Sequence, residues 1–387
     1  MDNPFEYSKH ATGKMFLGRK KDVAALRNLM LQNENVVIFG PPKSGKASLI
    51  QQAFFEMRIS RKDFTVCEME MLDIRDCTSF LCRLGDTVIR SCVTTPAEYR
   101  ELIGTFLKGT HFVFDQRNYS DKDQIVSLNW DLDAADMEAM LKLPYNISRN
   151  GGQQLYIILK EFQNISLCDG YEKLLKMMEE VMKEQRSMLD PASCSFLMTG
   201  SKVNAMKEIF EHWRFFHRTV EILPISPIDE KEVIEHVIKG FLSGGKVVDR
   251  ENIKGVCSLL KGNIWYVNHY FSICDHLSKG YITDAIMVEA LQDLLSIHQP
   301  RFEATVSDLT TFQLNLLRAI TEGHSKFSSA EVIRQYGLSS SANVKRLKDA
   351  LAKKEIVTFS SNEEPMILDP LFEYWVKKYF FHQKLDL

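Results

Sequence analysis

The residues with the clearest chemical potential are those at 40–46, which read Gly-Pro-Pro-Lys-Ser-Gly-Lys and follow an apolar run at 36–39. In a loop of this spacing, successive backbone N–H groups point inward and the next helix presents its N-terminus to an anion. The glycines allow the turn, and the last lysine reaches the outer phosphates. The segment therefore predicts a phosphate-binding loop between a strand and a helix, with a nucleoside triphosphate as the expected ligand.

The residue after this lysine departs from what such a loop requires. A Ser or Thr normally stands there because its hydroxyl is a direct magnesium ligand, but this chain has Ala47. Ser48 points about a third of a turn away on the following helix and is a poor substitute. The candidate nucleotide-binding residues are the loop and these two neighbours: Gly40, Pro41, Pro42, Lys43, Ser44, Gly45, Lys46, Ala47 and Ser48.

A second nucleotide motif should be an apolar strand that ends in Asp-Glu, where the Asp serves magnesium and the Glu polarises the attacking water. The apolar run at 155–159 is followed instead by Lys160 and Glu161. A lysine at the Asp position would repel a magnesium ion, because the two charges have the same sign. Glu161 remains the candidate catalytic base, and Lys160 becomes a candidate nucleotide-binding residue.

These two departures leave three interpretations open. In the first, Lys160 supplies positive charge beside the phosphates, and ATP or ADP is bound with little or no metal and little hydrolysis. In the second, the site is a structural relic that binds nothing. In the third, hydrolysis is slow and magnesium is held by phosphates and water alone, since magnesium usually keeps several waters. No metal ligand is therefore assigned from the sequence.

Two further polar residues could take part in chemistry on a phosphate. Ser201 lies at the carboxyl end of a predicted strand, where ligands bind in open α/β sheets. It could contact the outer phosphate or the attacking water, or it could simply cap the next helix. Arg218 precedes the last predicted strand and could reach a phosphate in this or a neighbouring subunit, or form a structural salt bridge.

The surrounding elements alternate between strands and helices, which predicts an α/β core with a parallel sheet and right-handed crossovers. The continuous apolar runs are typical of strands buried on both faces. We expect strands at 36–39, 65–69, 155–159, 195–198 and 220–223, with a short one at 111–114 beside a loop-like insertion. We expect helices at 20–32, 77–108, 134–143 and 171–186, and the third should end at Pro144.

The pattern changes after Pro224 and Pro227. Residues 229–296 look purely helical. From 309 onward, helices at 310–321, 328–336 and 341–354 precede strand-like runs at 356–359 and 366–368 and a closing aromatic helix at 372–381, which describes a winged helix-turn-helix. We predict three domains: 1–226 for nucleotide binding, 227–305 as a helical lid, and 306–387 as the winged helix.

The third helix of the predicted winged helix carries the candidate DNA-binding residues Lys345, Arg346 and Lys348. Such a helix can enter the major groove, and lysine contacts to phosphate would make binding salt-dependent. Glu363 and Glu364 in the wing would repel phosphate. A protein partner is therefore the alternative to DNA for this surface.

Composition excludes some classes of function. The 387 residues carry a net charge of -3, which gives no general polyanion signal. The eight cysteines show no metal-ligand spacing and are expected to be reduced thiols. No apolar stretch approaches the roughly 20 residues of a membrane span, and the N-terminus is unlike a signal peptide. We expect a cytoplasmic protein without membrane contact, and its assembly into an oligomer is left open.

These motifs together resemble the archaeal-type ATPase family, a branch of the STAND and AAA+ P-loop NTPases. The most specific match is the segment 161–165, Glu-Phe-Gln-Asn-Ile, which is similar to the family's Asp-Glu-Phe-Gln segment. Other matches cover most of the chain: Asn3-Pro4-Phe5, Phe16-Leu17-Gly18-Arg19, the loop at 40–49, Thr199-Gly200-Ser201, 262–267 with Trp265 in place of a proline, and Asp369-Pro370-Leu371-Phe372. The resemblance adds Gly18 and Arg19 to the candidate nucleotide-binding residues.

The resemblance implies an ATP-binding AAA+-like core, a helical lid, a winged helix, and ATP hydrolysis coupled to conformational switching. Ala47 and Lys160 depart from the family at its two magnesium positions, so hydrolysis does not follow automatically. Three hypotheses result: a nucleotide-dependent switch with weak or absent hydrolysis, an active ATPase that acts on DNA, and a nucleotide-independent adaptor for protein contacts.

Overall fold

The computed structural model describes residues 4–115, 124–189 and 192–384, so Asn3 of the predicted N-terminal motif lies outside the described residues. The chain divides into two compact units. The unit that we call the sheet unit contains Lys20–Gly40 and Ala53–Ile225. The unit that we call the lid unit contains Met1–Arg19, Pro41–Gln52 and Ser226–Leu387. The phosphate loop is therefore counted with the lid unit, and the three-domain division stays a prediction.

A five-stranded sheet forms the centre of the sheet unit, in the order β2-β5-β6-β1-β7. Every neighbouring pair in it is parallel, which confirms the predicted fold class. The strands are β1 (Asn35–Phe39), β2 (Thr65–Glu70), β5 (Leu155–Lys160), β6 (Cys194–Gly200) and β7 (Val220–Ile222). The carboxyl ends of parallel strands meet at one edge, so the residues that follow β5 and β6 lie close together.

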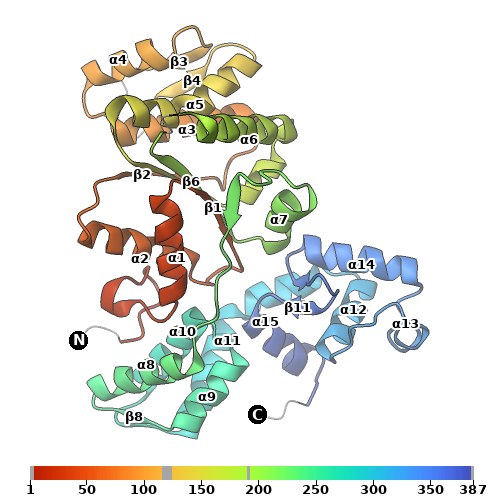
Figure 1. The fold of residues 1–387 in the computed structure, drawn as a ribbon. Coiled ribbons are helices and arrows are strands. Elements are labelled where there is room, and N and C mark those ends of the chain that lie inside the picture. The colour runs from red at the N-terminus through yellow and green to blue at the C-terminus, as the bar shows by residue number, and fades with distance from the viewer. Residues whose placement is uncertain (1–3, 116–123, 190–191, 385–387) are drawn as a thin grey trace. The chain divides into compact units, whose positions relative to one another are not determined.

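Helices cover both faces of this sheet (Figure 1). The helix α1 (Lys20–Leu31) packs on one face, and α3 (Cys77–Cys92), α5 (Ala134–Gly151) and α6 (Tyr171–Ser187) pack on the other. Smaller elements complete the unit: α4 (Pro96–Phe106), the hairpin of β3 (Phe112–Phe114) and β4 (Val126–Leu128), a 3-10 helix (Phe162–Leu167), α7 (Val203–Lys207) and a π-helical turn (Glu208–His212). The buried apolar side chains of these layers form one continuous core.

The structure corrects the predicted end of the helix that contains Pro144. This helix, α5, continues through Pro144 to Gly151 and closes on Gly152, which has a left-handed φ of 60°. Leu143, Pro144 and Tyr145 are all buried, so packing against the core outweighs the loss of one backbone hydrogen bond. The prediction for 111–114 was correct, but its partner strand β4 was not expected.

The lid unit is mainly helical. The helix α2 (Lys46–Ile59) begins at the phosphate loop, and a 3-10 turn (Gly13–Met15) precedes it in the chain. Then come α8 (Glu230–Ser243), α9 (Arg250–Leu259), α10 (Ile264–Leu277) and α11 (Asp284–Ser307). Two very short strands, β8 (Val247–Val248) and β9 (Tyr281–Ile282), pair in parallel within the stretch that was predicted to be purely helical.

The C-terminal part of the lid unit has the predicted winged-helix order. Three helices are followed by an antiparallel pair of strands: α12 (Thr311–Thr321), α13 (Ala330–Tyr336), α14 (Ser341–Lys353), β10 (Val357–Phe359) and β11 (Pro365–Ile367). The closing segment is α15 (Pro370–Trp375) continued by a π-helical turn (Val376–Phe380). Its aromatic side chains join a core that runs from Phe5 through the lid helices to Val376. Among the described residues, no helix combines the length and apolar character that crossing a bilayer requires.

Candidate functional site

The phosphate loop has the backbone that its sequence predicts. Lys43 and Gly45 have positive φ values of 63° and 92°, which turn the chain sharply before α2. Lys46 is the first residue of that helix, and its Nζ lies 2.9 Å from the carbonyl oxygen of Pro41 and 3.4 Å from Ser44 Oγ. The ammonium group is therefore held within the loop, where a phosphate would meet it together with the N-terminus of α2.

Arg19 lies against the outside of this loop. Its Nη1 donates to the carbonyl oxygen of Ser44 at 2.7 Å, and its Nε donates to the carbonyl oxygen of Ser226 at 2.8 Å. A Cβ on Gly45 would come within 2.6 Å of the same guanidinium group. Gly45 is thus required both by its φ and by the approach of Arg19. Of the predicted residues Gly18 and Arg19, only Arg19 has a printed contact with the loop, whereas a Cβ on Gly18 would meet Ile228 and Glu232.

The segment 5–13, which we call the N-terminal strap, connects the first turns of α2 with the lid helices. The amide of Ala11 donates to Ser48 Oγ at 3.1 Å, and the amide of Gly13 donates to Gln52 Oε1 at 2.7 Å. Ser48 therefore has a structural partner, which adds to its wrong angular position as a reason against a magnesium role. At position 47 the methyl group of the alanine offers no oxygen.

Lys43 contacts the lid instead of a carboxylate. Its Nζ lies 4.9 Å from the centroid of the Trp265 ring, at the start of α10. The helix is capped by Asn263, whose side chain accepts from the amides of Trp265 and Tyr266. The indole N–H of Trp265 donates to the carbonyl oxygen of Tyr7 in the N-terminal strap at 2.8 Å. Sequence reasoning noted Trp265 as a replacement for proline but gave no sign of this contact.

In the sheet unit, Lys160 pairs with a neighbouring strand. Its ammonium forms an ion pair with Glu68 of β2, and in the strand register it stands opposite Glu70. Burial raises the pKa of Glu70, while the nearby Lys160 acts in the opposite direction. The positive charge of Lys160 is thus largely matched by carboxylates on β2.

Glu161 and Ser201 lie together at the carboxyl edge of the sheet. Glu161 has a left-handed φ of 55°, which is costly for a residue with a side chain and is typical of functional sites. Its Oε2 accepts from Ser201 Oγ at 2.5 Å, from the Ser201 amide at 3.3 Å and from Gln163 Nε2 at 2.6 Å. The candidate base is therefore held by three donors, of which Gln163 was not predicted to have a role.

Close packing beside Glu161 limits how this arrangement can change. A Cβ on Gly200 would lie 2.4 Å from Met206 Cγ and 2.6 Å from Gln163 Oε1, so only glycine fits there. Arg218, the remaining catalytic candidate, is exposed just before β7. It has a φ of 62°, and its carbonyl oxygen accepts from Arg186 Nη1 at 3.4 Å. Its assignment to a phosphate stays a prediction.

The cations of the winged helix are not equivalent. Lys345 and Arg346 are exposed on α14. Lys348 is mostly covered, because its Nζ lies 3.0 Å from Glu363 Oε2 and 4.6 Å from the centroid of Phe359. Two of the three predicted DNA-binding residues are therefore available to a partner, and the third holds the wing against the helix.

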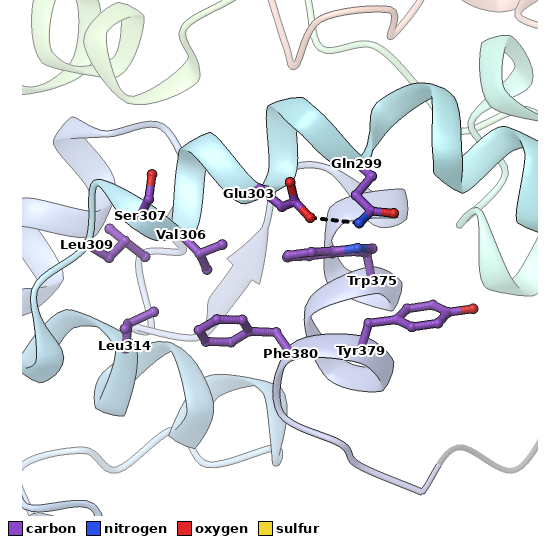
Figure 2. Close-up of a pocket in the computed structure, with 9 residues that line it drawn as sticks. All are labelled: Gln299, Glu303, Val306, Ser307, Leu309, Leu314, Trp375, Tyr379 and Phe380. Atoms are coloured by element: carbon purple, nitrogen blue, oxygen red, sulfur yellow. Dashed lines mark hydrogen bonds between the residues drawn. The ribbon is translucent and has the colours of Figure 1, made fainter.

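A cavity of about 640 Å³ lies elsewhere in the lid unit, between α11, α12 and the closing segment (Figure 2). Aromatic side chains from the closing segment face polar side chains from α11 across it: Trp375, Tyr379 and Phe380 on one side, and Gln299, Glu303 and Ser307 on the other. Gln299 Nε2 donates to Glu303 Oε1 at 2.7 Å. None of the predicted site residues lines this cavity.

One cluster of potential metal ligands occurs among the described residues, at His111, Asp133 and Asp136. The two aspartates form the capping box of α5, and Asp136 also accepts from the amide and the ring of His111 at 2.8 Å and 3.0 Å. The hydrogen bond to Asp136 raises the pKa of His111. The cluster is fully explained by the attachment of β3 to the start of α5.

We compared the sequence and the structure of this chain with those of known proteins. Residues 300–378 match a family model described as "Probable winged helix domain". The whole chain is similar to the Walker-type ATPase paby2304 of Pyrococcus abyssi, with a TM-score of 0.65, 14% sequence identity, and coverage of 96% of this chain and 99% of that chain. No curated protein sequence matches this chain significantly.

The ORC2 protein of Aeropyrum pernix is also similar. Its structure in ADPNP-ADP complexes gives a TM-score of 0.57 at 13% identity, covering 96% of this chain and 94% of that chain. Its ADP form gives a TM-score of 0.55 at 13% identity, covering 95% and 93%. At such identities the likeness establishes the fold. The chain thus has the fold of an AAA+ P-loop ATPase with a parallel α/β core, a helical lid and a C-terminal winged helix, as the sequence predicts.

Proposed function

We propose that this chain is a nucleotide-dependent switch of the STAND/AAA+ type, which binds ATP or ADP and hydrolyses ATP weakly or not at all. The observation that carries the proposal is a phosphate loop with its cations in place but without oxygen at either magnesium position. Lys43 and Lys46 belong to the loop, and Arg19 donates to one of its carbonyl oxygens. At the two magnesium positions, 47 and 160, the chain has an alanine and a lysine.

The comparisons support the proposed nucleotide binding, but they do not bear on weak hydrolysis. The similar ORC2 protein is described in ADPNP-ADP complexes, and the similar paby2304 protein is described as a Walker-type ATPase. Weak hydrolysis is inferred from this chain's own residues. Glu161 has its Oε2 engaged by Ser201 and Gln163, and Ala47, directly after Lys46, carries no side-chain oxygen.

The structure shifts which cation we assign to the phosphates. Lys160 is paired with Glu68, so bringing its charge to a ligand would leave a carboxylate without its partner. Lys46 Nζ lies 2.9 Å from the carbonyl oxygen of Pro41, and Arg19 Nη1 donates to the carbonyl oxygen of Ser44. We therefore assign phosphate binding to the loop lysines and Arg19, and we treat Lys160 mainly as an obstacle to magnesium.

Nucleotide binding is tested by its effect on stability. ATP at about 100 times its dissociation constant should raise the free energy of unfolding by about 2.7 kcal/mol, measured by urea unfolding both with magnesium and with EDTA. Lys46→Ala should remove most of this stabilisation, and Lys62→Ala, an exposed lysine outside the loop, should keep it. If ATP and ADP stabilise the wild type in neither condition, the chain is a nucleotide-independent adaptor instead.

We further propose that the exposed face of α14 binds a macromolecular partner, with DNA as the first candidate. If Lys345 and Arg346 each neutralise one phosphate, about two counterions are released, which gives a slope of log affinity against log salt of roughly -2. Lys345→Glu should flatten that slope in fluorescence anisotropy with duplex DNA, and Lys326→Glu, an exposed control outside α14, should not. Binding that ignores both salt and Lys345→Glu would favour a protein partner.

The cytoplasmic location and the oligomeric state stay predictions. Arg218 bears on both assembly and catalysis, since the sequence leaves open whether it reaches a phosphate in this or a neighbouring subunit or forms a structural salt bridge. Its exposed position before β7 leaves it accessible to another copy of the chain. Sedimentation of the protein with and without ATP would test whether nucleotide promotes such an assembly.

A further inference from the structure

The cavity between α11 and the closing segment takes no part in the proposed nucleotide site (Figure 2). Its volume of about 640 Å³ lies within the range of roughly 300–1,000 Å³ that pockets for small molecules occupy. Part of its lining is aliphatic, from Val306, Leu309 and Leu314, whereas aromatic and polar side chains line the rest. A ligand that matches this lining combines an apolar body with one polar group.

The aromatic wall of the cavity comes from an unusual turn of the backbone. After Trp375, residues Val376–Phe380 form a π-helical turn. This wider turn brings Tyr379 and Phe380 to the cavity together with Trp375, and such turns are rare and frequent at functional sites. Trp375 is buried against Phe302, with ring centroids 5.7 Å apart, whereas Tyr379 and Phe380 are 43% and 39% exposed. The wall therefore presents two large rings to a ligand from a packed base.

The opposite wall carries one carboxylate, that of Glu303. Gln299 Nε2 donates to it at 2.7 Å, which orients it beside the cavity (Figure 2). In the described part of the chain, no lysine, arginine or histidine forms an ion pair with Glu303. Other carboxylates of the surrounding elements are paired with lysine or arginine, namely Asp308, Asp369 and Glu373. Glu303 thus gives the cavity a negative charge that the protein itself does not neutralise.

Ring faces of the closing segment already hold a cation. The Nζ of Lys378 lies 5.3 Å from the ring centroid of Tyr374 and 5.6 Å from that of Tyr379. The face of an aromatic ring is negative and attracts a positive group, more strongly where water is excluded. Because one cation already lies over Tyr379, a second belongs with Phe380, across the cavity from Glu303, where repulsion between the two like charges is smaller.

We propose that this cavity binds a small organic cation that carries an aliphatic chain. Its ammonium group lies between the ring of Phe380 and the carboxylate of Glu303, and its chain lies along the aliphatic part of the lining. The ring face and the carboxylate attract the positive charge, and the aliphatic lining removes the chain from water. Binding at this site needs neither nucleotide nor DNA, so it is independent of the proposed function.

Isothermal titration calorimetry of the full chain with hexyltrimethylammonium tests this site. One equivalent should bind in a saturable way, and lengthening the chain from butyl to hexyl should tighten binding by up to about fourfold per methylene. Heptanoate, an anion with a chain of similar length, should bind about tenfold more weakly than the cation, because Glu303 repels it. No saturable heat at millimolar hexyltrimethylammonium, or equal affinities for the cation and the anion, would overturn the proposal.

Two variants test the assigned partners of the cation. Glu303→Gln keeps an oxygen for Gln299 but removes the charge, so it should weaken hexyltrimethylammonium binding about fivefold and leave heptanoate binding no weaker. Phe380→Leu keeps an apolar side chain but removes the ring, so it should weaken cation binding about two- to fivefold. Glu289→Gln changes an exposed glutamate of α11 outside the cavity and should bind as the wild type does. If either Glu303→Gln or Phe380→Leu keeps the wild-type affinity for the cation, the proposed site is wrong.

Discussion

Restoring both magnesium positions, by Ala47→Thr with Lys160→Asp, is expected to raise ATP hydrolysis about 100-fold. The threonine hydroxyl supplies the direct magnesium ligand, and the aspartate orders the water shell of the ion. A positioned metal is worth several kcal/mol of transition-state stabilisation, and a 100-fold gain needs only about 2.7 kcal/mol. Phosphate release over a magnesium titration measures the effect, and turnover should depend on magnesium only in the restored variant.

The ion pair of Lys160 dictates how this variant must be made. Lys160→Asp alone would place a third carboxylate beside Glu68 and Glu70 and remove their cation. We therefore expect the best result when Glu68→Gln is added. Glu161→Gln in the same background should remove the gained turnover, because it deletes the candidate base. A folded triple variant that binds ATP but shows the turnover of the wild type would contradict our explanation of weak hydrolysis.

Truncating the aromatic anchor of the N-terminal strap, by Phe5→Ala, is expected to lower the free energy of unfolding by about 3–5 kcal/mol. Phe5 is 0% exposed, and its ring centroid lies 4.7 Å from that of Phe241 and 6.0 Å from that of Phe271. Gly240 leaves room for it, since a Cβ there would lie 2.7 Å from the ring. Loss of the ring would leave a cavity at the centre of the lid helices.

Urea unfolding followed by circular dichroism gives the change in stability from the shift of the midpoint at constant slope. The matched control is Phe312→Ala, because Phe312 is 46% exposed in the same unit and should cost about 1 kcal/mol or less. We also expect Phe5→Ala to weaken ATP binding, since the strap carries the hydrogen bonds of Ala11 and Gly13 to α2. Equal stabilities of the two variants would show that the strap does not anchor the lid.

Most of the architecture could be predicted because its signals are local. The run at 155–159 and the one at 195–198 are apolar throughout, which is typical of central parallel strands, and both occupy the middle of the sheet. The winged helix was readable from the spacing of its helices and from the polar turn between two short strands. The phosphate loop was identified by residue type alone, and its backbone turns sharply through positive φ values at Lys43 and Gly45.

The errors in the fold have a common physical origin. Pro144 was expected to end a helix, but buried neighbours on both sides keep α5 continuous. The strands β4, β8 and β9 have only two or three residues each. These short strands form because the packing of the neighbouring helices holds each of them beside a partner strand. Tertiary contacts decide both cases, and such contacts leave no local pattern in the sequence.

The sequence predicted which residues form the candidate site. It did not predict which side chains those residues contact in the folded chain. Lys160 and Glu68 are 92 positions apart in the chain, and Glu161 and Ser201 are 40 apart. Ser201 was recognised because strand ends gather at one edge, but that rule does not say which carboxylate it contacts. The position of Lys43 over Trp265 depends on how the strap seats α10, which only the folded chain reveals.

The interleaving of the two compact units has a consequence for protein dissection. The chain crosses between them at 19/20, 40/41, 52/53 and 225/226, and the third crossing falls inside α2 (Lys46–Ile59). No single cut can release either unit as one contiguous polypeptide, and any fragment that omits the other unit also loses half of this helix. We expect a single cooperative unfolding transition for the region around α2, and complementation of split fragments only when a break leaves 41–59 uncut.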